Sequence, residues 1–496
     1  MATATRQRAG HSVPGHRSPV HGPTRAPTFL LRSTQLQQLI GFLKTPKGLD
    51  LFRRSFAENM MYKVSKYREL LTEAERESEH QIEVIDIRVA DLRRRAKVSE
   101  DTCNWEIFES VSAGYREAME RAARLEALLQ AAQARHAAGG RDAVALRDDL
   151  VDSLYGLAAH DVQSHIINRV ADLIGSFLKD PALFRSKPLN LMLVGSPGSG
   201  KTTLAAAIGV AFARAGIFVG DRLVEAGRAE LVAQYEGQTV ARTRSFLMSH
   251  LDGGVIFVDE AYAITPWQDG KPEGYGAEAA AAMVEFMTRY AGLYCLIVAG
   301  YEKEMVRYFL TANEGLARRF PYKFVLRDLT CEELLVVFKR QLLLQQQVGA
   351  LEGTAAAHGE AYFTREAWRY LTNVVRTATQ GITTHVDEFD PATRRTYHGT
   401  RRFVPRHELV HRLFENQAGA MVTLAEEALQ VLMALLPYEA EVRPGDRHSF
   451  GPHGLEVMRS ILEQRIRNSA LSDAEPYLSE LNSLDRNVRA HTPPLL

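Results

Sequence analysis

One short segment constrains the fold more than any other part of the 496-residue sequence. The pattern G-x-x-x-x-G-K-[ST] is matched by Gly195-Ser196-Pro197-Gly198-Ser199-Gly200-Lys201-Thr202, which follows the apolar run Leu191–Val194. Thr203 then opens a helix-forming run that reaches residue 214. A glycine-rich turn between a strand and a helix lets backbone N–H groups approach phosphate oxygens, which the helix N-terminus also attracts. The segment predicts a phosphate-binding loop.

The last residues of this loop carry the chemistry. A lysine at the position of Lys201 reaches the β- and γ-phosphates of a nucleotide, and the hydroxyl of Thr202 is a ligand for Mg²⁺. We therefore predict that residues 195–202 and Thr203 bind ATP, and that Thr202 contributes to a magnesium site.

A second apolar run, at 255–258, ends in the adjacent carboxylates Asp259 and Glu260. Ligands of open α/β sheets bind at the carboxyl ends of the strands, so these residues are expected beside the phosphate-binding loop. We expect Asp259 to hold Mg²⁺ through water. Glu260 is predicted to be catalytic, because hydrolysis needs a group that polarises the attacking water.

Short apolar runs alternate with helical stretches through the middle of the chain, which indicates a parallel-sheet α/β architecture. The predicted strands lie at 191–194, 217–219, 255–258, 293–299 and 324–326. The sequence before these strands is predicted to be helical as far as Gly139-Gly140, where the two glycines predict the end of the helix. After the strands, Thr330 and Glu333 are spaced as a capping box that opens a further helical part.

These changes of pattern divide the chain into parts. The divisions are a basic tail expected to be disordered at 1–28, a helical N-terminal module at 29–138, a linker at 139–150, the α/β core at 151–328, a helical lid at 329–438 with a polar insertion near 377–400, and a C-terminal extension at 439–496. Pro405 is expected to begin a long helix after the insertion.

Composition excludes several classes of protein. Lys and Arg number 60, and so do Asp and Glu, so no basic excess marks a nucleic-acid binder. Three widely separated cysteines give neither a metal-ligand spacing nor a disulfide framework. No apolar run approaches the ~18 residues of a membrane span. We expect a soluble intracellular protein, cytoplasmic unless the Arg-rich, acid-free N-terminus directs it to an organelle.

Several stretches together resemble AAA+ ATPases of the CbbX/SpoVK type, the group of red-type Rubisco activase and sporulation stage V protein K. They are LVEAGRAELV at 223–232, YEGQT at 235–239, GVIFVDEAY at 254–262, YGAEA at 275–279, IVAGY at 297–301 and NEGLARRF at 313–320. The resemblance implies an α/β fold, with a P-loop AAA+ module of parallel sheet and flanking helices, and a C-terminal helical lid. Here an all-helical N-terminal module precedes it.

The resemblance also implies roles for residues outside the phosphate-binding loop. Arg318 and Arg319 stand where the family has its arginine finger, which acts on the γ-phosphate of the neighbouring subunit. Gly156 and Leu157 match the segment that contacts adenine. The lid sensor arginine is left open between Arg402 and Arg406, because the family's Gly-Asn-Ala-Arg is replaced here by GTRRFVPR at 399–406.

Tyr235, Glu236 and Gly237 lie where hexameric AAA+ remodellers place the pore loop that grips a polypeptide. The middle residue is a carboxylate here instead of an apolar side chain. A finger that acts between subunits requires a homo-oligomeric ring, so we expect a hexamer that remodels a protein client. Which client it remodels, and whether that client is Rubisco, stays open.

Two other functions remain as alternatives. A DNA-directed AAA+ ATPase, such as a loader or a helicase accessory, would use the basic stretches at 93–97 and 401–406. A nucleotide-controlled scaffold would bind its partner through the helical N-terminal module. Stimulation of ATP turnover by polypeptide or by DNA separates the first two functions, and an intact Glu260 argues against a scaffold that does not hydrolyse ATP.

Overall fold

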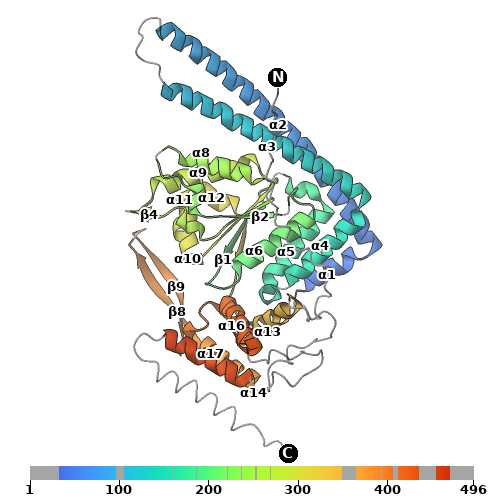
Figure 1. The fold of residues 1–496 in the computed structure, drawn as a ribbon, viewed down its shortest axis with the longest axis vertical. Coiled ribbons are helices and arrows are strands. Elements are labelled where there is room, and N and C mark those ends of the chain that lie inside the picture. The colour runs from blue at the N-terminus through green and yellow to red at the C-terminus, as the bar shows by residue number, and fades with distance from the viewer. Residues whose placement is uncertain are drawn as a thin grey trace, which may run out of the picture. The chain divides into compact units, whose positions relative to one another are not determined.

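The computed structural model describes residues 33–96, 105–158, 160–185, 187–220, 222–235, 237–251, 254–268, 270–348, 365–391, 394–405, 411–434 and 454–469 (Figure 1). The tail predicted at 1–28 lies outside these ranges, as do Glu236 and Arg406. Within them, no helix is both long and apolar enough to cross a membrane.

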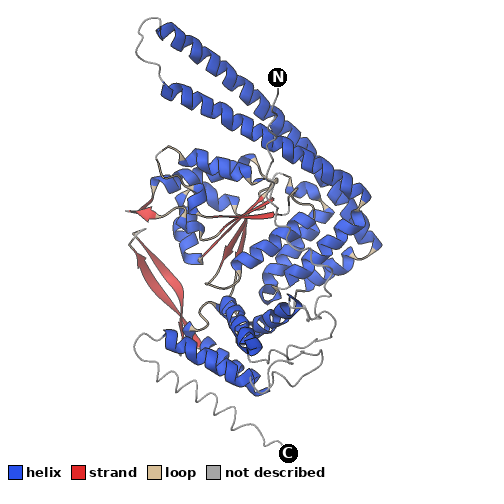
Figure 2. Cartoon of the chain, in the orientation of Figure 1, coloured by secondary structure: helices blue, strands red, loops and turns tan. Residues whose placement is uncertain are grey.

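A five-stranded parallel sheet forms the centre of the α/β part, with helices around it (Figures 1 and 2). Its strands are β1 (Leu191–Val194), β2 (Arg222–Ala226), β3 (Gly254–Val258), β6 (Cys295–Gly300) and β7 (Tyr322–Val325). Their order is β2-β3-β6-β1-β7, and every neighbouring pair is parallel. The central strands β1, β3 and β6 are buried along their whole length, as continuous apolar runs predict. The predicted α/β fold class is confirmed.

One predicted strand is wrong. Residues 217–219 form a buried turn, and the second strand of the chain is β2, a few residues later. β2 is an edge strand of the sheet, and its residues before Ala226 are exposed or half-buried. A search for continuous apolar runs finds central strands and misses such an edge strand.

Helices cover the sheet and connect its strands. They are η1 (Asp161–Gln163), α5 (Ser164–Lys179), η2 (Pro181–Phe184), α6 (Lys201–Arg214), α7 (Arg228–Leu231), α8 (Thr239–Ser249), η4 (Ala261–Ala263), α9 (Gly274–Arg289), α10 (Glu302–Glu304), the π-helix η5 (Met305–Phe309), α11 (Leu310–Ala312) and α12 (Glu314–Arg319). A small antiparallel hairpin, β4 (Trp267–Gln268) and β5 (Lys271–Pro272), precedes α9.

The N-terminal part of the described chain forms the helices α1 (Thr34–Leu43), α2 (Pro46–Ala96), α3 (Trp105–Arg141) and α4 (Ala143–Ala158), and α2 and α3 lie side by side (Figure 1). The linker expected at 139–150 is helical, because α3 runs through Gly139-Gly140 and α4 follows almost at once. Gly139 does not stop the helix: a Cβ there would lie 2.7 Å from the Phe56 ring. This glycine lets α2 approach α3 closely.

The N-terminal helices share one continuous hydrophobic core with the sheet. Polar side chains of α2 also bind backbone carbonyls of the α/β part. Asn59 donates to Gly216 O over 2.7 Å, and Lys63 Nζ donates to Gly292 O. Gly216 precedes β2 and Gly292 precedes β6. These contacts therefore lie at the amino ends of the strands, whereas the phosphate-binding loop lies at their carboxyl ends.

A second hydrophobic cluster, beginning at Leu329, holds the lid together. Its helices are α13 (Cys331–Val348), α14 (Arg365–Thr379), α16 (Gln417–Ala434) and α17 (Gly454–Ser469). The predicted capping box is confirmed, since Glu333 N donates to Thr330 Oγ1 and Thr330 N donates to Glu333 Oε2. The described part of the C-terminal extension, α17, packs into this lid cluster through side chains such as Leu462.

The polar insertion of the lid is an antiparallel hairpin of β8 (Gly381–Asp390) and β9 (Arg395–Pro405). Pro405 therefore ends a strand, and the predicted helix starts later, at Gln417, as α16. Arg402, one of the two sensor candidates, lies in β9 opposite Thr384. The alternation of β-branched and polar residues in 381–386 is the signal that would have predicted this strand.

Candidate functional site

The phosphate-binding loop lies at the carboxyl end of β1, where its sequence predicts it. Gly195 N donates to Gly300 O over 3.2 Å, which joins the start of the loop to the end of the neighbouring strand β6. Gly198 and Gly200 have φ values of 64° and 88°, a left-handed backbone that glycine adopts without a steric cost. Helix α6 then starts at Lys201. Its unpaired N–H groups are at the loop.

Lys201 folds back onto this loop. Its Nζ donates to Gly195 O over 3.1 Å and to Ser196 O over 3.0 Å, and it lies 5.3 Å from the centre of the Tyr301 ring. Burial lowers the pKa of Lys201, while the charges of Asp259 and Glu260 oppose that shift. A cation whose hydrogen bonds go to neutral carbonyls is suited to transfer to the stronger acceptors of a phosphate group.

Thr202, Asp259 and Glu260 come together at the same edge of the sheet. Thr202 Oγ1 donates to Asp259 Oδ2 over 3.2 Å, and Glu260 N donates to Asp259 Oδ1 over 2.9 Å. Glu260 has a φ of 46°, which is rare for a residue with a side chain. Such strained conformations concentrate at active sites. The metal and catalytic roles of these residues stay predictions.

Two tyrosines flank the carboxylates. Tyr262 and Tyr301 stack with ring centres 5.9 Å apart. Burial raises the pKa of the Tyr262 hydroxyl, and the charge of Glu260 and a hydrogen bond to it add to the rise. Tyr262 is thus a partner of Glu260 that the sequence did not identify, because a tyrosine after an Asp-Glu pair also reads as an ordinary buried aromatic residue.

These residues fit ATP and Mg²⁺. The donor set is one ammonium group, one hydroxyl and two carboxylates, which matches a triphosphate and a cation that prefers oxygen ligands. Ser199 is only 6% exposed, and its Oγ has no hydrogen-bond partner within the described ranges. Among the described residues no three His, Cys, Asp or Glu side chains gather as a metal cluster. Mg²⁺ usually needs only one or two carboxylates beside phosphate oxygens.

Arg318 and Arg319 are the last residues of α12, which lies at the ends of the strands opposite the phosphate-binding loop. Arg318 is exposed, and Arg319 Nη2 donates to Thr288 Oγ1 over 2.9 Å. Both precede the first residue of β7, whereas the phosphate-binding loop follows the last residue of the parallel strand β1. Because four strand residues span ~13 Å, the two arginines are remote from the phosphate-binding loop of the same chain.

The expected adenine segment lies inside α4. Leu157 is fully buried in the main hydrophobic core, and the Tyr155 hydroxyl accepts a hydrogen bond from Lys44 over 2.9 Å. Val162, a little further on, packs against the lid cluster. Contact of Gly156 and Leu157 with adenine stays a prediction, and Val162 is the residue of this region that reaches toward the lid.

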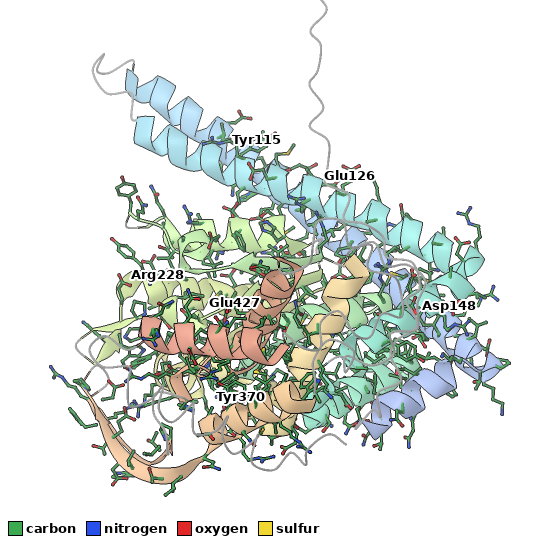
Figure 3. All side chains as sticks on the ribbon, turned by 60° about the horizontal axis from the view of Figure 1, so that its bottom comes forward. Tyr115, Glu126, Asp148, Arg228, Tyr370 and Glu427 are labelled. Atoms are coloured by element: carbon green, nitrogen blue, oxygen red, sulfur yellow. The ribbon has the colours of Figure 1, made fainter. Side chains whose placement is uncertain are left out.

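Tyr235 is 68% exposed and precedes α8. Gly237 has a φ of 76°, so the backbone turns sharply there. Arg228 (Figure 3), at the start of α7, binds both sides of the β4–β5 hairpin, because it donates to Ile264 O over 2.8 Å and to Glu273 Oε2 over 2.5 Å. The role of Tyr235 as a pore residue stays a prediction.

The fold and the site define the class of P-loop α/β nucleotide-binding proteins. Similarity to known proteins shows which family of this class the chain belongs to. Residues 191–322 match the family described as "ATPase family associated with various cellular activities (AAA)". Stage V sporulation protein K of Bacillus subtilis is 38% identical over 31% of this chain and 46% of that protein.

Two further relatives are covered over a larger share of their length. The chloroplastic ribulose bisphosphate carboxylase/oxygenase activase of Cyanidioschyzon merolae is 36% identical over 40% of this chain and 66% of that protein. The CfxQ homolog of Cyanidium caldarium is 35% identical over 40% of this chain and 68% of that protein. The chain belongs to the AAA ATPases, and within them to the CbbX/SpoVK type. It spans less than half of the sporulation protein.

Proposed function

We propose that this chain binds and hydrolyses ATP with Mg²⁺ as one subunit of a ring, and that the ring remodels a protein client through a central channel. One observation carries the proposal. The carboxyl ends of the strands bring together four polar residues, Lys201, Thr202, Asp259 and Glu260. The arginine pair of α12 lies at the opposite, amino ends of the strands. Membership of the AAA family supports it.

Each residue of the site then has a task. Lys201 exchanges its loop carbonyls for the β- and γ-phosphate oxygens, and Glu260, in hydrogen-bond contact with Tyr262, orients the attacking water. Thr202 and Asp259 would hold Mg²⁺, which when bound offsets the negative charge of the phosphates. The protein supplies positioning and electrostatic stabilisation, which account for most of the catalysis of phosphoryl transfer.

The arginine pair supports a ring. A finger residue must approach the γ-phosphate, and Arg318 and Arg319 are separated from their own loop by the length of β7. They would reach a phosphate only across a subunit boundary. An active site shared between neighbouring copies would be complete only in a closed assembly.

The proposal is tested by measuring nucleotide binding and turnover in parallel. Lys201→Ala is expected to lose ATP binding, and Glu260→Gln is expected to bind ATP but hydrolyse it at least 100-fold more slowly. Lys187→Ala and Glu225→Gln, at exposed positions near the sheet, serve as controls and should match the wild type. Wild-type turnover by Glu260→Gln would refute the assignment of the water-orienting carboxylate.

The client is proposed to be a polypeptide. Tyr235 offers an exposed aromatic ring that could contact such a chain. We expect an unfolded, carboxymethylated protein to stimulate ATP turnover and duplex DNA to leave it unchanged. Stimulation by DNA alone would favour the DNA-directed alternative.

A further inference from the structure

Gln417, the first residue of lid helix α16, binds the phosphate-binding loop directly. Its Nε2 donates to Ser196 Oγ over 3.0 Å and to Asp328 Oδ1 over 2.7 Å. Its Oε1 accepts from Leu329 N over 2.9 Å. Ser196 Oγ in turn donates to Asp328 Oδ1, so the three side chains form a closed ring of hydrogen bonds.

The partners of Gln417 fix the orientation of its amide group. An acceptor oxygen must face the N–H of Leu329, and a donor must face the carboxylate of Asp328. Asp328 and Leu329 belong to the short segment that joins the two hydrophobic cores, since Leu326 packs in the first and Leu329 in the second. One side chain of the lid therefore holds both the joining segment and the loop.

The backbone of the lid touches the loop at the same place. Ala418 N donates to Gly198 O over 3.1 Å. A Cβ on Gly198 would lie 1.8 Å from the carbonyl oxygen of Asn416, so only glycine permits this approach. Gln417 itself has a φ of 36°, a strained backbone that the surrounding contacts must hold in place.

We propose that Gln417 is a positioning residue that clamps the lid onto the phosphate-binding loop and thereby limits the rate at which nucleotide leaves. The inference rests on the proposed function, because it assumes that this loop holds a nucleotide. Release requires the lid to move away from Ser196, and that movement breaks the hydrogen bonds of Gln417. Gln417 does not touch the reacting atoms in this account.

The test is the dissociation rate of fluorescently labelled ADP from the full-length protein, measured by displacement with excess unlabelled ATP. Loss of the amide in Gln417→Ala removes three hydrogen bonds, two of them to groups that water can reach, so we expect release to become about tenfold faster. Gln341→Ala is the matched control, because Gln341 is a lid glutamine that bonds Glu426 within the lid. It should release ADP at the wild-type rate.

A charge exchange separates positioning from a general loss of structure. Gln417→Glu places a carboxylate where the amide now donates to Asp328, so repulsion should also open the clamp. Adding Asp328→Asn supplies an amide donor opposite the new carboxylate and should restore slow release. A merely destabilised lid would not be rescued by a second substitution, and thermal unfolding of all variants shows whether each is folded.

The outcomes distinguish this inference from the proposed function. Failure of the wild-type protein to bind labelled ADP would refute the proposed function itself. Wild-type binding with unchanged release from both Gln417→Ala and Gln417→Glu would overturn the clamp alone. Faster release from Gln417→Glu that Asp328→Asn does not reverse would assign Gln417 a structural role and also overturn the proposal.

Discussion

Lys63 is a buried lysine outside the nucleotide site. It lies on α2 with a side chain only 1% exposed, donates to Gly292 O, and has the Tyr62 and Phe218 rings within 6.0 Å of Nζ. Burial lowers the pKa of Lys63 to about 7 from its ordinary 10.5. Near pH 7 the amine of Lys63 in the folded protein is therefore only partly protonated.

This pKa predicts a pH dependence of stability. Between pH 7 and pH 10.5 the unfolded chain binds a proton at Lys63 that the folded chain has released, so the free energy of unfolding rises with pH. The contribution is about 1.4 kcal/mol per pH unit at most. We expect Lys63→Met to remove this rise when urea unfolding is compared at pH 7 and pH 9. Equal pH slopes for the two proteins would contradict the prediction.

At this scale the sequence predicts residues that belong to a motif and misses those that act through tertiary contacts. The loop from Gly195 to Thr202 and the Asp259-Glu260 pair were placed correctly relative to one another, because strand, turn and helix fix them locally. Gln417 lies 221 residues from Ser196, and no local pattern links them. Lys63 likewise reads as an ordinary surface lysine of a helix until its partner Gly292 is known.

At the scale of elements, α2 acts as a brace of the α/β part. The Phe56 ring is fully covered, lying against Gly139 of α3 and Gly216 before β2. Phe56→Ala would leave a cavity between three parts of one core, which typically costs 3–5 kcal/mol. We expect a loss of about that size in urea unfolding.

Met61→Ala is the control for this prediction, since Met61 lies on the same helix and is 61% exposed. It should change the free energy of unfolding by less than about 0.5 kcal/mol. If Phe56→Ala destabilises the protein no more than Met61→Ala does, α2 does not brace the sheet.

The sequence predicted helices and central strands well because both show a strong pattern. β1 is predicted to the residue, and β3 and β6 to within two residues at each end. β2 was missed because an edge strand mixes polar and apolar residues, and the helix break at Gly139 was wrong because that glycine serves helix packing. The β8–β9 hairpin lies in the part predicted only as a polar insertion near 377–400, without secondary structure.

At the scale of the whole assembly, the proposed ring predicts a role for Tyr235. Tyr235→Ala should keep basal ATP turnover, because the residue lies outside the phosphate-binding loop, but lose stimulation by an unfolded polypeptide. Phe389→Ala is a suitable control, since Phe389 is an aromatic residue of similar exposure on the lid hairpin. Full stimulation of Tyr235→Ala would refute its gripping role. A ring structure with Tyr235 buried inside its own subunit would also refute it.

The carboxylate beside this tyrosine refines the prediction. Glu236 lies outside the described residues, but its charge next to the gripping ring should favour basic segments of a client. Engagement of such a segment should weaken as salt rises, because the Debye length falls from about 10 Å at 0.1 M to about 3 Å at 1 M. Stimulation that is independent of salt would contradict this part of the account.

The shared active site is the central claim, and a mixing experiment tests it most directly. Subunits with Arg318→Ala and Arg319→Ala keep their loop but lose the finger, whereas Lys201→Ala subunits keep the finger but lose the loop. Each protein alone should be nearly inactive, since a finger residue accounts for about 10³-fold or more of turnover. In an equal mixture that has exchanged subunits, about a quarter of the interfaces combine an intact loop with an intact finger. The account predicts recovery of about a quarter of wild-type ATP turnover. No recovery, with subunit exchange demonstrated by energy transfer between labelled variants, would contradict it.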